Sequence, residues 1–65
     1  MERQEAISKV MNMTIEEVKA KLISFGWRKM DWPAIPVFQK PTKWGVRSCF
    51  EGMERDVLIE EMTEA

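Results

Sequence analysis

The segment from Thr14 to Gly26, TIEEVKAKLISFG, decides the fold that this sequence predicts. Thr14 and Glu17 have the spacing of a capping box, in which the hydroxyl satisfies a free backbone N–H and the carboxylate reaches back to the helix start. Gly26 can adopt the left-handed conformation that ends a helix. We therefore expect a helix over residues 15–25. Its apolar stripe consists of Ile15, Val18, Leu22 and Phe25.

A second helical pattern precedes this segment, over residues 4–11. Its apolar residues recur on one helix face, and they are Ala6, Ile7, Val10 and Met11. Asn12 then interrupts the pattern, and asparagine tolerates the left-handed backbone conformation of a sharp turn. The sequence therefore predicts two short helices joined by a tight turn.

The sequence after this helical pair favours a β-hairpin and a third helix. Pro33 and Pro36 exclude a helix over residues 31–36, because proline removes a backbone donor and restricts the residue before it. Further along, two short runs flank a loop that carries Pro41 and Gly45. The expected ranges are 35–39 and 46–50 for the strands, 40–45 for the loop and 53–62 for the last helix.

None of these elements can bury an apolar face alone, so they must share one core. The core residues that we expect are Ile7, Met11, Ile15, Val18, Leu22, Phe38, Val46, Phe50, Val57 and Leu58. We expect Trp27 to fold back onto this core and Trp32 to pack on the ring of Pro33. The predicted fold class is a small α+β domain that spans residues 1–65.

Composition narrows the functions open to the chain. It has 65 residues, one domain at most, and no histidine, which excludes His general bases and His-containing zinc sites. Its single cysteine, Cys49, cannot form an internal disulfide, so we expect a reducing cytosol and a small buried thiol rather than a nucleophile. No run approaches the ~18 apolar residues of a membrane span. We expect a cytoplasmic binding protein that is not an enzyme, needs no metal or cofactor and does not enter a membrane.

The net charge of −1 hides a strong asymmetry along the chain. Residues 28–47 carry five bases and one acid, whereas residues 48–65 carry one base and six acids. Electrostatic fields are local on the scale of a ~10 Å Debye length, so the basic segment can meet a polyanion on one face.

The pattern over residues 4–25 resembles a helix-turn-helix DNA-binding motif. Ile7 and Met11 fall at inward positions of the first helix, Asn12 at the turn, and Val18 and Leu22 where the second helix is anchored. With the basic hairpin and closing helix, the chain resembles the small winged helix-turn-helix proteins of bacteriophages. Excisionases and the Mu-repressor-type DNA-binding domain are two families of this kind that it resembles. The sequence departs from the pattern at Ser8, Glu16, Glu17 and Lys21.

This resemblance implies a phage or prophage regulator of transcription or recombination. It would bind double-stranded DNA, sequence-specifically or architecturally, as a dimer or multimer. The helix over 15–25 would lie in or over the major groove, with the wing at 40–45 on the backbone or minor groove. Trp44 either packs across the hairpin onto the core or contacts the partner. The DNA-binding residues expected are Thr14, Lys19, Lys21, Arg28, Lys29, Lys40, Lys43, Trp44 and Arg47.

A second class of function stays open at this point. The chain could be a small protein-binding inhibitor, such as a phage factor that blocks a host enzyme or a defence system. Its surface would then be the acidic C-terminal helix with Met53, Met62 and the tryptophans. Binding to random duplex DNA at low salt distinguishes the two classes.

Overall fold

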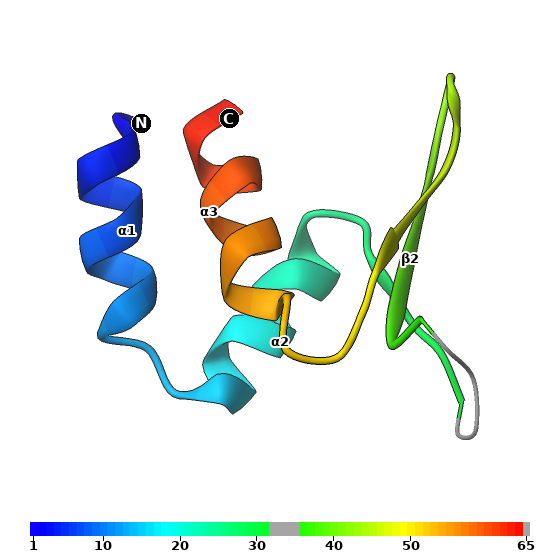
Figure 1. Ribbon diagram of the computed structural model, residues 1–65, viewed down its shortest axis with the longest axis horizontal. Coiled ribbons are helices and arrows are strands. Elements are labelled where there is room, and N and C mark those ends of the chain that lie inside the picture. Colours follow the sequence, from blue (N-terminus) through cyan, green and yellow to red (C-terminus); the bar gives the residue numbers. More distant parts are fainter. Residues whose placement is uncertain (32–35, 65) are drawn as a thin grey trace.

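The computed structural model describes residues 1–31 and 36–64. This part of the chain forms three helices and a three-stranded antiparallel sheet (Figure 1). The α+β class expected from the sequence is therefore observed. The helices are α1 (Arg3–Met11), α2 (Ile15–Ser24) and α3 (Glu54–Glu64), and the strands are β1 (Arg28–Lys29), β2 (Phe38–Thr42) and β3 (Gly45–Cys49).

Helix α3 organises the helical half of the molecule. It lies beside α1 and runs in the opposite direction, and it also packs against α2 (Figure 1). The sheet forms the opposite side of the molecule from α1, and the β2–β3 hairpin projects from it (Figure 1). In the described ranges, none of the helices is long and apolar enough to cross a membrane.

Both ends of α2 form as the sequence predicts, and the helix is one residue shorter than expected. The Oγ1 atom of Thr14 accepts from the N–H of Glu17 at 3.2 Å, and Oε1 of Glu17 accepts from the N–H of Thr14 at 2.8 Å. At the other end Gly26 has φ of 99°, and the N–H of Trp27 donates to the carbonyl of Leu22 at 3.1 Å. This is the pattern of a Schellman ending. It turns the chain so that Trp27 folds back onto the core, as expected.

Asn12, in the turn between α1 and α2, has a right-handed backbone conformation, so the expectation of a left-handed conformation at this residue is wrong. This residue has φ of −91° and ψ of −3°, and its side-chain amide donates to the carbonyl of Ser8 at 2.9 Å. The guanidinium of Arg55 donates to the carbonyls of Val10 at 2.6 Å and Met13 at 2.9 Å. Because Arg55 supplies donors from α3, the end of α1 needs no left-handed residue.

Strand β2 is central, with β1 on one side and β3 on the other, both antiparallel to it. The sequence does not predict β1, because two residues are too short to show an alternating pattern. Strand β3 begins and ends one residue before the expected range of 46–50.

Strand β2 departs further from the prediction. It begins at Phe38 instead of residue 35 and continues through Pro41 to Thr42. Proline is tolerated there because β1 pairs only with Phe38 and Gln39, so Pro41 has a neighbouring strand on one side alone. The expected loop of 40–45 therefore narrows to a turn at Lys43 and Trp44.

The core is built from all three helices and the sheet. Five expected core residues are buried: Val18, Leu22, Phe38, Val57 and Leu58. Ile7 is half-buried and packs against them. The other buried apolar residues are Ala6, Val10, Trp27, Cys49, Ile59 and Met62. Burial of Cys49 agrees with the prediction. The expected contact of Trp32 with Pro33 lies outside the described residues.

The prediction of a core position is wrong for four residues, because their side chains are exposed: Met11, Ile15, Val46 and Phe50. Helix α1 turns Ala6 and Val10 inward, which leaves Met11 64% exposed. In the hairpin, the residues that share the inner face of β3 are Arg47 and Cys49. Val46 therefore lies on the outer face and is 63% exposed.

Candidate functional site

The tip of the β2–β3 hairpin carries the most exposed large apolar side chain among the described residues. Trp44 is 88% exposed, so it does not pack onto the core, which was one of its two expected placements. The Nζ atom of Lys43 lies 5.5 Å from the centroid of its ring. Thr42 holds the turn, since its Oγ1 atom donates to the carbonyl of Gly45 at 2.6 Å and accepts from the N–H of Trp44 at 3.2 Å. The tip thus presents an indole and an ammonium side by side to solvent.

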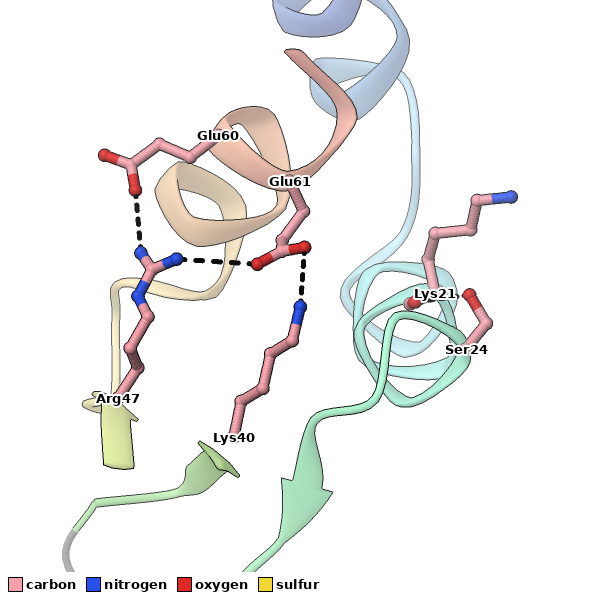
Figure 2. Close-up of polar contacts among 6 residues, drawn as sticks. All are labelled: Lys21, Ser24, Lys40, Arg47, Glu60 and Glu61. Atoms are coloured by element: carbon pink, nitrogen blue, oxygen red, sulfur yellow. Dashed lines mark hydrogen bonds and ion pairs between the residues drawn. The ribbon is translucent and has the colours of Figure 1, made fainter. Parts of the chain in front are cut away.

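Lower on the hairpin, two of the expected DNA-binding bases are paired with acids of α3 (Figure 2). Lys40 and Arg47 face each other across β2 and β3. The Nζ atom of Lys40 lies 3.0 Å from Oε2 of Glu61, and the guanidinium of Arg47 lies 3.6 Å from Oε1 of the same residue. Arg47 also lies 3.1 Å from Oε2 of Glu60. Two bases and two acids form this cluster, so its formal charge is zero.

This cluster changes the expected role of Lys40 and Arg47. Both are already matched by carboxylates, and the side chain of Glu61 is only 8% exposed. Arg47 in addition lies over the ring of Trp27, with Cζ 5.6 Å from its centroid. These contacts fasten the hairpin to α3 rather than presenting both bases to a partner. The opposite net charges of residues 28–47 and 48–65 were the signal in the sequence that could have indicated such pairing.

The other expected bases lie in three separate places. Arg28 and Lys29 are exposed on β1, and Lys43 is exposed at the hairpin tip. On α2, Lys21 is exposed and Lys19 is half-buried. Within the described residues these five side chains form no ion pair. They remain available to meet an anion.

The start of α2 is unfavourable for an approach to DNA. Glu16 and Glu17 are both exposed there. Hydrogen bonds from the backbone N–H and the hydroxyl of Thr14 lower the pKa of Glu17 from its ordinary value of 4.5, so the carboxylate stays charged. Thr14 itself is occupied as the helix cap. The hairpin tip and β1 therefore offer a polyanion less repulsion than the first turn of α2.

Some residues of the surface expected for a protein-binding inhibitor are buried. Met62 is 7% exposed, which corrects its assignment to a contact surface. Met53 is exposed, as are the acids Glu51, Asp56 and Glu64. Glu61 is buried in the cluster with Lys40. An inhibitor surface on α3 would therefore lack two of its expected residues.

Comparison of the chain with protein-family models, with curated proteins and with solved structures finds no match in any of the three. A function has to be argued from the arrangement of its own residues.

Proposed function

We propose that the protein binds double-stranded DNA and that the tip of the β2–β3 hairpin makes the principal contact. The observation that carries this proposal is the 88% exposed Trp44 beside Lys43 at the projecting turn. A large exposed apolar ring is uncommon on a surface that binds nothing. Beside a duplex, the indole can insert along the minor groove or against the sugars while the ammonium neutralises a phosphate.

The exposed bases of the sheet extend this contact. Arg28 and Lys29 on β1 would neutralise further phosphates as the hairpin lies along the duplex. Lys40 and Arg47 act differently in this proposal, because their ion pairs with α3 set the angle of the hairpin. Lys19, Lys21 and Thr14 on α2 are secondary contacts, limited by the neighbouring acids.

The proposed biological role is that of a winged helix-turn-helix regulator of phage type, acting in transcription or recombination. A single module of this size makes few phosphate contacts, so its affinity is limited. Two or more copies on adjacent sites would raise it by making the second binding event intramolecular. We therefore propose a dimer or multimer on DNA.

The salt dependence of binding to random duplex DNA tests this function. Three exposed bases, Arg28, Lys29 and Lys43, give an expected slope of log affinity against log salt on the order of −3, from roughly −0.9 per phosphate. Lys43→Gln should flatten the slope by about one unit and weaken binding to all sequences alike. Arg3→Gln is the matched control, because it removes the same charge from the exposed start of α1.

Fluorescence anisotropy with a labelled duplex, repeated at several salt concentrations from ~50 mM upward, measures both effects. Trp44→Ala should weaken binding with little change in slope, since it removes no charge. Absence of salt-sensitive binding by the parent protein contradicts the proposal. Equal effects of Lys43→Gln and Arg3→Gln contradict the role of the hairpin tip, because they would reflect net charge alone.

A further inference from the structure

A groove of about 780 Å³ lies between α1 and α2, away from the hairpin. Its apolar lining includes Met13 and Phe25, which are half-buried, and Met62 of α3, which is buried. Lys9 and Lys21 also line it and are exposed, so they lie at its margins. None of the lining residues belongs to the sheet. Apart from Lys21, which is a secondary contact in the proposed DNA interface, the groove is therefore a surface distinct from the one proposed to meet DNA.

The margins of the groove are basic. Its lining contains two lysines and no acidic residue. Lys9 lies 3.8 Å from Glu5 in a pair that is exposed on both sides, so the pair holds this lysine weakly. Lys21 extends from α2 away from the cluster around Glu61 (Figure 2). Both ammonium groups can therefore turn toward an anionic ligand in the groove.

The spacing of the lining residues along the first helical segment suits an elongated ligand. Met1, Ser8 and Asn12 share one helix face and span roughly 16 Å at ~1.5 Å per residue. That corresponds to about three turns of a docked helix. Three methionines line the groove, and the flexible methionine side chain adapts to apolar residues of different shape.

We propose that this groove docks an amphipathic, acidic helix of a partner protein. The apolar stripe of that helix, at i, i+3/i+4 and i+7, would lie on Met1, Met13 and Phe25, the accessible apolar side chains of the lining, as in other helix-in-groove complexes. Glu or Asp residues flanking the stripe would lie beside Lys9 and Lys21. The inference goes beyond DNA binding and does not depend on it, because the two surfaces share only Lys21. With both occupied, the protein would bring its partner to a duplex.

Designed peptides test the docking site directly. One 15-residue helical peptide carries leucine at the stripe positions, glutamate at the positions that flank the stripe and alanine elsewhere. A second replaces every glutamate with lysine, and a third scrambles the first. The glutamate peptide should bind and shift the backbone amide signals of Ser8, Asn12 and Met13 in ¹H–¹⁵N correlation spectra. The other two should bind at least about tenfold more weakly at low salt.

Charge reversal at the margin supplies the sharper comparison. Lys21→Glu should weaken binding of the glutamate peptide by about threefold to tenfold and strengthen binding of the lysine peptide. Arg3→Glu, on α1 and outside the groove lining, should leave both affinities within about twofold. Met13→Ala should weaken binding of the glutamate peptide while the circular dichroism signal of the helices stays unchanged. If Met13→Ala unfolds the protein, the comparison of Lys21→Glu with Arg3→Glu still tests the proposal.

Five results would overturn the proposal. The scrambled peptide could bind as tightly as the glutamate peptide, or the lysine peptide could. The amide shifts could fall on the hairpin around Trp44 instead of on α1 and α2. Laurate could produce the same shifts while the glutamate peptide produces none, which would make the groove a site for anionic lipid. Sedimentation could show a dimer that already occupies the groove, which would make the occupant a second copy.

Discussion

Lys40 and Glu61 are 21 residues apart in the chain, and their charged atoms lie 3.0 Å apart in the structure. The contact joins β2 to α3, with Lys40 partly exposed and Glu61 nearly buried. Arg47 reaches the same carboxylate from β3. One carboxylate thus receives a base from each strand of the hairpin, which makes it a polar link between the sheet and the helical half, in addition to the shared apolar core.

Replacing Glu61 should therefore loosen this link. Glu61→Gln is expected to lower the free energy of unfolding by about 1–3 kcal/mol, because two bases lose a buried charged acceptor. Glu60→Gln is the matched control, since it makes the same change at the adjacent exposed position and should cost less than about 1 kcal/mol. Urea denaturation followed by circular dichroism measures both. Equal costs would mean that the buried pair with Lys40 contributes no more than the exposed one.

The bonds from Arg55 to α1 predict a second stability effect. Arg55→Met keeps much of the side-chain length but removes the donors to the carbonyls of Val10 and Met13, so we expect a loss of about 2–3 kcal/mol. Arg3→Met, at an exposed position of α1, should change stability by less than about 0.5 kcal/mol. Urea denaturation compares the two, and a similar small cost for both would exclude Arg55 as the cap of α1.

The cap of α2 predicts a pH dependence. The pKa of Glu17 in the folded protein lies below 4.5 because of its bonds to Thr14. The stabilisation that the ionised carboxylate gives to the fold is therefore fully present above pH 4.5, and it is lost as the pH falls through this lowered pKa. Thr14→Ala should cost about 1 kcal/mol at neutral pH, whereas Thr14→Ser should be nearly silent. Thermal melts from pH 7 down to values below pH 4.5 should show that acid lowers the melting temperature less in Thr14→Ala than in the parent protein. The same acid loss in both would contradict a coupled cap.

Burial of Cys49 predicts an unreactive thiol. Desolvation, with a smaller effect of Glu54, raises the pKa of Cys49 from 9.0 to about 11. At pH 8 the folded protein should react with iodoacetamide far more slowly than the urea-unfolded chain. Because the folded pKa is raised, this thiol stabilises the fold below pH 9 and that contribution is lost as pH rises toward 11. Equal labelling rates for folded and unfolded chains would contradict this placement.

The predictable parts of the fold are those where local chemistry decides. Thr14, Glu17 and Gly26 fix both ends of α2 through bonds within a few residues, so the sequence predicts that helix almost to the residue. The hairpin was harder. The apolar pattern pointed Val46 inward, whereas Arg47 and Cys49 take the inner face. Arg47 meets acids of α3 there, and Cys49 packs in the apolar core. A strand has only two faces, so one wrong assignment moves every neighbour with it.

The candidate site was predictable only in part for the same reason. The sequence correctly concentrates bases and a tryptophan around the hairpin, but it could not tell a paired base from a free one. Lys40 and Arg47 find acids that are 21 and 13 residues away, respectively, whereas Lys43 finds none among the described residues. The groove between α1 and α2 gave no signal at all, because its lining is drawn from all three helices.

The bonds between Arg55 and the end of α1 have a consequence for synthesis of the chain. Helix α1 has nine residues, fewer than the ~12–15 at which isolated helices become even marginally stable. Its packing partner and its cap both lie in α3, which the ribosome makes some 40 residues later. A nascent chain that has not yet reached Arg55 therefore cannot hold residues 3–11 in a helix. We therefore expect α1 to form only after α3 has emerged, and we expect a chain stalled before that point to leave its first segment open to proteases.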